Sequence, residues 1–323
     1  MATSAPVRFV IPAYNAEETI ADAIDSLLRQ TDTQWHATLI DDGSSDATRA
    51  IMRQAVVGDA RFDIVAFDQN RGVATARNYA VSTSTEPWIA FVDADDVLDD
   101  AYLSSMKHFV ECFPGFDMYH CNLYVVSPGV KKDVLFSEKT EPWSTTFPEI
   151  LDECVLALGG TWVRRDVFEA LGGFHEEYLC EDYDFFIRFV VKGYTQIMNP
   201  LALYSYRLRP QVSRSSDAVA SAYAVSDLLG SLEQDTRLSL SDRALVTQAR
   251  AKRIASIASL ETAVALERQA SLLREKLASI FGPSLADVMV RTIHVVSPLI
   301  RPIRKRLIER HARTHIAERT GTD

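Results

Sequence analysis

The chain has 323 residues, a mass of 36.1 kDa and a formal net charge of −10 at pH 7. Hydrophobic residues make up 47% and charged residues 24%, which is typical of a soluble globular protein and excludes wholesale disorder. The negative charge is concentrated in residues 1–216, which hold 18 Lys and Arg against 32 Asp and Glu, whereas residues 217–323 hold 16 against 12. An acidic surface of this kind is a poor partner for nucleic acid, so we expect none.

Short β-rich runs alternate with amphipathic helical patterns through the first hundred residues. The predicted strands cover residues 8–11, 37–40, 62–67 and 88–92, and the predicted helices between them cover residues 17–29, 47–57 and 72–82. Four strands that alternate with three helices predict a parallel sheet with right-handed crossovers.

The alternation loosens after residue 96. Here the pattern predicts helices over residues 100–113, 165–171 and 181–192, a long strand over 116–126 and an edge strand over 201–208. Beyond residue 217 the sequence is helical and poor in glycine, with long helices over 218–232 and 241–280. We therefore predict a catalytic domain at residues 1–215, with halves at about 1–98 and 99–215, and a C-terminal helical region at 216–323.

The fourth predicted strand ends in an acidic run, with Asp93, Asp95 and Asp96 directly after an apolar stretch. Ligands of open α/β sheets bind at the carboxyl ends of the strands. Carboxylates this close together repel one another, and a hard cation such as Mg²⁺ or Mn²⁺ relieves the repulsion. The D-x-D pattern therefore suggests a metal and a phosphate-bearing substrate, although a solvated turn before a helix explains the same residues.

Five motifs occur in an order and spacing that resemble the family-two inverting glycosyltransferases. They are residues 10–15 (VIPAYN), 40–46 (IDDGSSD), 70–72 with 76–78 (NRG and ARN), 91–96 (FVDADD), and 172–174 with 181–184 (GGF and EDYD). The resemblance covers about residues 7–210 and implies a GT-A fold, a Rossmann-like α/β architecture with a mostly parallel sheet flanked by helices. It also implies a nucleoside-diphosphate sugar as donor, with a UDP-sugar favoured, a divalent metal (Mn²⁺ or Mg²⁺), and a glycan or lipid-linked hydroxyl as acceptor.

The resemblance implies a donor site at the ends of the first four strands. Its residues are Pro12, Ala13, Tyr14, Asp42, Arg71, Arg77, Asp93 and Asp95. The loop with Tyr14 matches the one that packs on the donor base, and Asp42 matches the acid that accepts a hydrogen bond from it. Arg71 and Arg77 match basic residues beside the nucleotide. Two alternatives stay open: Tyr14 as a loop-packing aromatic and Arg77 as a helix-surface charge.

The same resemblance assigns the metal and the acceptor side. Asp93 and Asp95 match the pair that holds the metal, which bridges the diphosphate. Asp182 matches the general base that takes the proton from the acceptor hydroxyl, and a single displacement then inverts the anomeric centre. Glu181 and Trp162 match the acceptor side. As alternatives, the acids at residues 181–182 are favoured by a helix N-terminus, and Trp162 is a core residue.

Many members of that family carry a histidine shortly after the Tyr-Arg of the last core strand, sometimes as a metal ligand. This chain has Arg209 nearby instead, in the run Tyr206-Arg207-Leu208-Arg209. We hypothesise that Arg207 or Arg209 holds the diphosphate from a flexible loop that closes over the donor.

Two other classes of function fit parts of the sequence. Asp93 also begins a D-x-D-x-V motif of the haloacid-dehalogenase type of phosphatase, in which the first acid is a nucleophile, but that motif belongs on an early strand. The other rival is a non-catalytic scaffold that binds a sugar nucleotide. It predicts that Asp182→Asn leaves the biological function intact.

The ends of the chain bear on its location. No stretch of about 18 apolar residues suggests a membrane span, and residues 1–6 lack the apolar centre of a signal peptide, so we expect a cytoplasmic protein. Residues 291–313 mix apolar and basic side chains, and Pro298 and Pro302 interrupt the pattern. Such a stretch can lie peripherally on an anionic membrane, at the inner face of the cell membrane, or pack on the catalytic domain or a second subunit as a homo-oligomer.

Overall fold

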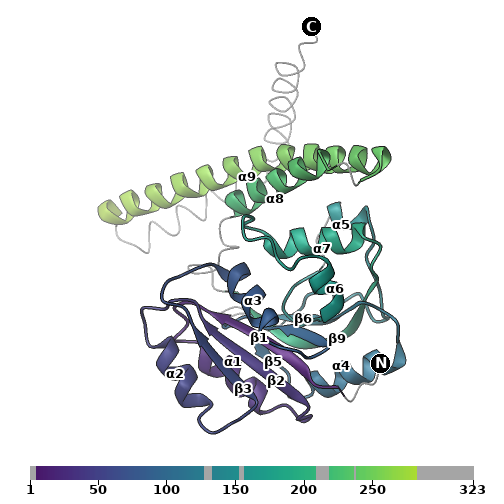
Figure 1. Cartoon of the computed structure of the whole chain (residues 1–323). Coiled ribbons are helices and arrows are strands. Elements are labelled where there is room, and N and C mark those ends of the chain that lie inside the picture. The colour runs from purple at the N-terminus through teal and green to yellow at the C-terminus, as the bar shows by residue number, and fades with distance from the viewer. Residues whose placement is uncertain (1–4, 127–132, 153–155, 209–217, 236–237, 282–323) are drawn as a thin grey trace. The chain divides into compact units, whose positions relative to one another are not determined.

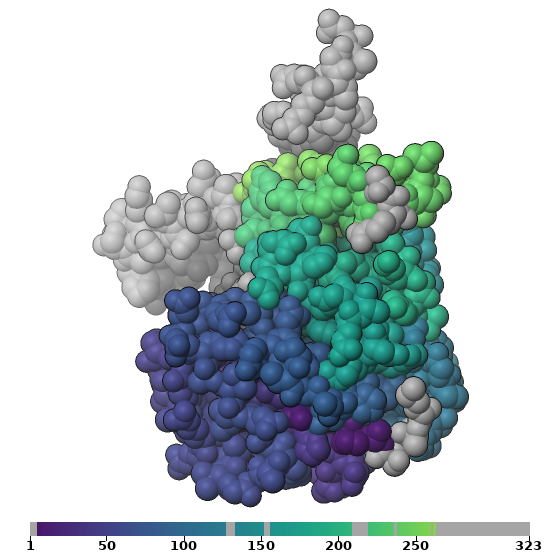
Figure 2. All heavy atoms as spheres, viewed as in Figure 1, coloured from purple at the N-terminus to yellow at the C-terminus, as the bar shows by residue number. Residues whose placement is uncertain are grey.

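The structure is a computed structural model that describes residues 5–126, 133–152, 156–208, 218–235 and 238–281 (Figure 1). The chain divides into two compact units, residues 1–216 with 234–246 and residues 217–233 with 247–323. In the first unit, the surface of the first hundred residues, drawn in purple and blue, is continuous with that of residues 156–208, drawn in teal (Figure 2).

The first unit contains a nine-stranded mixed sheet of order β3-β2-β1-β4-β8-β6-β9-β5, with β7 paired to β6. Four strands at one side are parallel: β1 (Val7–Ala13), β2 (Trp35–Asp41), β3 (Phe62–Ala66) and β4 (Trp88–Phe91). The remaining strands are β5 (Val97–Leu98), β6 (Met118–Val126), β7 (Asp133–Val134), β8 (Thr161–Arg164) and β9 (Gln196–Arg207). Strand order reverses between β1 and β4, so a crevice is expected where these two strands end.

Seven helices connect the strands among the described residues of this unit. They are α1 (Ile20–Leu28), α2 (Thr48–Ala55), α3 (Val73–Ser82), α4 (Tyr102–Cys112), α5 (Glu149–Asp152), α6 (Arg165–Ala170) and α7 (Glu181–Val191). Helix α1 shows why the sequence pattern works, because its buried residues Ile20, Ala23, Ile24 and Leu27 recur at the spacing of one helix face. The predicted alternation of strands and helices up to residue 92 is therefore confirmed.

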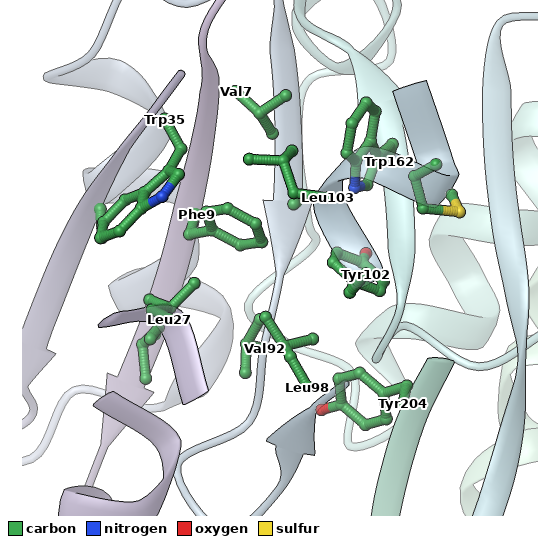
Figure 3. Close-up of a cluster of buried hydrophobic side chains, with 14 of the residues drawn as sticks. Val7, Phe9, Leu27, Trp35, Val92, Leu98, Tyr102, Leu103, Trp162 and Tyr204 are labelled. Atoms are coloured by element: carbon green, nitrogen blue, oxygen red, sulfur yellow. The ribbon is translucent and has the colours of Figure 1, made fainter. Parts of the chain in front are cut away.

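The hydrophobic core lies between the sheet and its helices. Every residue of β1 is buried, as expected of a central strand covered on both faces. The cluster in Figure 3 joins Phe9 and Trp35 of β1 and β2 with Tyr102 of α4 and Trp162 of β8. Large aromatic side chains thus connect the parallel part of the sheet to its antiparallel part.

Strand β9 differs from its prediction in length and place. It begins at Gln196 rather than residue 201, and it pairs with β6 along its length and with β5 on its other side. A register shift opposite Cys121 and Asn122 accommodates Pro200, and the amide of Asn122 donates to the Pro200 carbonyl at 3.3 Å. A proline normally signals the edge or end of a strand, so the sequence pattern hid this bulge.

The described residues of the second unit are helical. The unit contains α8 (Ala218–Glu233) and most of α9 (Leu240–Phe281), close to the predicted ranges. Arg250 of α9 donates to Glu233 of α8 at 2.7 Å, so the two helices pack together. None of the helices in the described ranges is long and apolar enough to cross a membrane. Residues 291–313 lie outside the described residues.

Candidate active site

Three loops that follow the parallel strands are braced against one another. The loop after β1 contacts the loop after β2, since Asn15 Oδ1 accepts the Ser45 amide at 2.9 Å and Glu17 Oε2 accepts the Ala47 amide at 2.9 Å. The loop after β2 in turn touches the loop after β3 at Gly43, whose φ is 74°. A Cβ at Gly43 would lie 2.4 Å from the Gln69 carbonyl carbon, so only glycine permits this approach.

Asp42 is the residue that holds the third loop. Its two carboxylate oxygens accept the backbone amides of Arg71 at 2.7 Å and Gly72 at 2.9 Å, and its side chain is buried. The sequence assigned Asp42 to the donor base, whereas the structure shows it anchoring the loop before α3. Contact between Asp42 and a base therefore stays a proposal.

The other donor residues of these loops differ in exposure. Pro12 and Ala13 are buried within β1, while the Tyr14 side chain is 53% exposed and available for stacking. A hollow of about 610 Å³ at the end of β3 is lined by Ala66, Phe67, Asp68, Gln69 and Arg71. The Arg71 guanidinium lies 4.8 Å from the centre of the Phe67 ring.

Arg77, in α3, lies at the centre of a charged cluster that also contains Asp93, Glu181 and Asp182. Its Nη2 donates to Asp93 Oδ1 at 2.6 Å, and its Nη1 donates to Glu181 Oε1 at 2.8 Å. Only 5% of the residue is exposed, so the interpretation as a helix-surface charge is wrong. Burial acts against the charge, but Asp93, Glu181 and Asp182 together raise the pKa of Arg77. The guanidinium thus joins the end of β4 to the beginning of α7, and both of its terminal nitrogens are occupied.

The predicted base, Asp182, is the second residue of α7 and is half-buried. Its Oδ1 accepts the Tyr183 amide at 2.7 Å. Burial raises the pKa of Asp182, and the charge of Asp93 adds to this, whereas Arg77 and the Tyr183 amide oppose it. A carboxylate whose pKa is raised is a better proton acceptor than an ordinary aspartate.

The acidic turn, residues 93–96, follows β4 and closes with a hydrogen bond from the Asp96 amide to the Asp93 carbonyl at 3.1 Å. Asp93 and Asp95 are half-buried, whereas Asp96 is 1% exposed. Asp96 accepts the Tyr204 hydroxyl at 2.7 Å and the Arg207 amide at 2.8 Å. Burial and the charges of Asp93 and Asp95 raise the pKa of Asp96 to about 8.

Within the described residues, no group of three or more His, Cys, Asp or Glu side chains is arranged to hold a metal ion. The donor set nevertheless fits a divalent cation of the predicted kind. Asp93 and Asp95 offer carboxylate oxygens, and the raised pKa of Asp96 reports negative charge that a cation would offset. Mg²⁺ and Mn²⁺ commonly take one or two protein carboxylates and complete their coordination with phosphate oxygens and water.

The structure gives Trp162 and Arg207 other side-chain contacts than the predicted ones. Trp162 is 2% exposed and packs between Trp88 and Tyr102, which favours the core interpretation over a place on the acceptor side (Figure 3). The guanidinium of Arg207 donates to Asp22 of α1 at 2.8 Å, so a role at the diphosphate requires that it leave this partner. Arg209 lies outside the described residues.

The sequence missed two residues that shape the site. Asn78, in the ARN motif, exchanges hydrogen bonds with the backbone of Phe174 at 2.8 and 2.9 Å, and so fixes the segment that leads to α7. Tyr204 hydrogen-bonds to both ends of the acidic turn. Asn78 could have been found from its motif, but nothing in the sequence signals the partners of Tyr204.

Comparison with known proteins identifies the family. Residues 9–172 match the family model described as Glycosyl transferase family 2, and the chain therefore belongs to this family. The chain is 36% identical over 132 residues to the succinoglycan biosynthesis protein ExoO of Rhizobium meliloti (41% of this chain, 37% of the relative). It is 38% identical over 91 residues to WfgD of Escherichia coli, named a UDP-Glc:alpha-D-GlcNAc-diphosphoundecaprenol beta-1,3-glucosyltransferase (28% of this chain, 35% of the relative).

The match spans about a third of the length of these curated relatives. Among solved structures, the chain resembles residues 1–349 of S. aureus TarS in complex with UDP-GlcNAc. The TM-score is 0.65 at 19% identity, covering 98% of this chain and 92% of TarS 1–349. This likeness confirms the predicted GT-A fold. The haloacid-dehalogenase hypothesis is not supported, since the motif of Asp93 ends the fourth strand of a family-two domain.

Proposed function

We propose that the chain is an inverting glycosyltransferase that moves a sugar from a nucleoside-diphosphate sugar to a hydroxyl of a glycan or a lipid-linked saccharide. The observation that carries the proposal is the Arg77 bridge, which joins the predicted metal ligand Asp93 to Glu181, the neighbour of the predicted base. Membership of the family supports it. The E. coli relative is named for a UDP-sugar donor and a diphosphoundecaprenol-linked acceptor, which supports a UDP-sugar and a lipid-linked acceptor here.

Each residue of the cluster has a distinct task. Asp182 takes the proton of the acceptor hydroxyl as the oxygen attacks the anomeric carbon, and the bond to the diphosphate breaks on the opposite face. Arg77 holds Glu181 and Asp93 in fixed positions on either side of the reacting centre. Asp93 and Asp95 would hold Mn²⁺ or Mg²⁺, and the bound ion would stabilise the charge of the leaving nucleoside diphosphate.

The remaining donor contacts come from the braced loops. The exposed ring of Tyr14 stacks on the base, and Asp42 and Arg71 shape the loop beside it. Arg207, after it leaves Asp22, or Arg209 provides positive charge for the diphosphate.

The proposal assigns catalysis to residues 1–215 and contact with a membrane or a partner to residues 216–323. A lipid-linked acceptor fits a protein that lies peripherally at the cytoplasmic face of a membrane, through the basic stretch 291–313. Sedimentation with anionic liposomes at low salt tests this assignment, and failure to sediment would count against it.

A donor screen tests the central proposal. Melting curves with Mn²⁺ and a panel of nucleoside-diphosphate sugars should show stabilisation by a UDP-sugar, which EDTA reduces. At a hundred times the dissociation constant, ligand binding stabilises a protein by about 2.7 kcal/mol, which is readily measured. If no nucleoside diphosphate stabilises the protein, the proposal fails. Donor binding without any transfer to acceptor would favour the non-catalytic scaffold.

A further inference from the structure

The hydroxyl of Tyr204 lies between the two ends of the acidic turn. It accepts the backbone amide of Asp93 at 3.1 Å and donates to Asp96 Oδ2 at 2.7 Å. Tyr204 belongs to β9, more than a hundred residues further along the chain, and it is 1% exposed. It therefore contacts the turn from the protein interior and cannot touch a substrate.

The hydrogen bonds leave little freedom in this arrangement. A phenol has one proton to donate, and here it goes to Asp96, which leaves the oxygen lone pairs to accept the Asp93 amide. The second oxygen of Asp96 accepts the Arg207 amide at 2.8 Å, so β9 holds this carboxylate from two positions. The backbone of β9 also pairs with β5 directly after the turn, where Leu98 lies opposite Tyr204.

The Gly159-Gly160 turn closes over the phenol on its other side. A Cβ at Gly159 would lie 2.6 Å from Cζ and 2.7 Å from the hydroxyl oxygen of Tyr204. A Cβ at Gly160 would lie 2.7 Å from Cys121 Sγ, and the φ of Gly160 is 78°. These two glycines let backbone pack directly against the ring, so the ring cannot move aside without disturbing β6 and β8.

We propose that Tyr204 is a positioning residue that fixes the acidic turn so that Asp93 and Asp95 face a divalent cation and the donor diphosphate together. The proposal rests on the function proposed above and adds to it a residue that acts through Asp93 and Asp96 rather than on the substrate. Outer groups that orient metal ligands typically change metal affinity or activity by about 10- to 100-fold when they are removed.

Tyr204→Phe tests the proposal, with Tyr119→Phe as its matched control. Tyr119 on the neighbouring β6 is also 1% exposed, and its hydroxyl likewise makes one donated and one accepted hydrogen bond, to the Phe113 carbonyl at 2.8 Å and from the Phe116 amide at 3.3 Å. Both variants keep the ring, so both should fold, and their melting temperatures should fall by similar amounts. A purely structural role of Tyr204 predicts that the two variants behave alike in UDP binding with and without Mn²⁺.

The first readout is hydrogen exchange of residues 92–98, followed by mass spectrometry. Tyr204→Phe should accelerate exchange there, because the Asp93 amide loses its acceptor, while Tyr119→Phe should not. The second readout is UDP binding measured by calorimetry with Mn²⁺ and with EDTA. The gain in affinity that Mn²⁺ provides should fall about tenfold in Tyr204→Phe and stay unchanged in Tyr119→Phe.

The outcomes separate the two proposals. Unchanged exchange in Tyr204→Phe, or an unchanged gain from Mn²⁺, would overturn the positioning role. A wild-type protein that binds no UDP under either condition would count against the proposed function instead. In that case the exchange comparison alone would still decide whether Tyr204 fixes the turn.

Discussion

Two buried arginines lie at opposite ends of the parallel sheet. Arg8, near the beginning of β1, donates to Glu86 through Nε at 2.9 Å and Nη2 at 2.7 Å. Arg77 of α3 lies near the other end, where its guanidinium donates to both Asp93, which follows β4, and Glu181. Each arginine is less than 10% exposed, so both pairs avoid most of the competition from water.

The acids at the two ends differ in the direction of their pKa shifts. Burial disfavours the charge of Glu86, but hydrogen bonds from Arg8 and His36 overcome it and lower the pKa of Glu86 to about 2. At the other end, burial and mutual repulsion raise the pKa of Asp182 and bring that of Asp96 to about 8. Arg8 also pairs with Asp63, but that side chain is 68% exposed, so Glu86 is the buried acid that Arg8 neutralises and the pair stabilises the fold. At the other end, Asp93, Glu181 and Asp182 all face Arg77, so the negative charge exceeds what one guanidinium neutralises. Such imbalance is typical of a site that binds a cation and moves a proton.

The largest expected effect concerns the base. Asp182→Asn should lower the rate of transfer by about 10²- to 10⁴-fold, because the acceptor hydroxyl loses its proton acceptor. UDP binding should persist, and the protein should be slightly more stable at neutral pH, since the raised pKa means that folding disfavours the ionised side chain. Steady-state transfer assays and melting curves measure this, with the exposed Glu177→Gln as control. If Asp182→Asn kept full activity, Asp182 would not be the base, and the proposed difference in role between the acids near Arg77 and Glu86 near Arg8 would be lost.

Exchange of each arginine for methionine compares the clusters directly. Arg8→Met and Arg77→Met each leave buried carboxylates without their cation and should lower the free energy of unfolding by about 3–5 kcal/mol. Of the two variants, Arg77→Met alone should also weaken UDP binding in Mn²⁺, because Arg77, unlike Arg8, contacts the acidic turn. Urea denaturation and calorimetry on the folded variants test this. Equal loss of UDP affinity in both would show that the effect is general destabilisation.

Glu86 should make a large contribution to the pH dependence of stability below pH 4.5. Its folded pKa of about 2 lies below its ordinary value of 4.5, so its contribution is complete above pH 4.5 and is lost as the pH falls toward 2. The shift corresponds to a loss on the order of 3 kcal/mol across this window. Glu86→Gln should lose stability at pH 6 and show a flatter decline between pH 5 and 3. An unchanged slope in urea denaturation over this range would contradict the assignment.

The smallest expected effect concerns the exposed ring of Tyr14, in the loop after β1. Tyr14→Ala should weaken UDP binding by about 1 kcal/mol, or roughly fivefold, because a stacking surface is lost. Its free energy of unfolding should change little, since Tyr14 is 53% exposed. Calorimetric titration of UDP measures the change, with the exposed Val57→Ala as control. Unchanged affinity would leave Tyr14 as a loop-packing aromatic.

The amino-acid sequence alone predicts the parallel half of the sheet and the types of residue that follow the carboxyl ends of its strands. Periodicity is a local property, so residues such as Ile20 and Leu27 reveal the buried face of α1 without any tertiary information. The motifs likewise placed Asp93 directly after a strand, where ligands bind.

The contacts of these side chains become visible only in the tertiary structure. Arg77 and Glu181 are separated by 104 residues and Tyr204 and Asp96 by 108, and no local pattern encodes such pairs. Burial was equally hidden, because a tryptophan such as Trp162 has the same local signature in a core and at a binding site. Pairing and burial depend on how distant elements pack, and this packing separates the acid that stabilises the fold from those that we propose for catalysis.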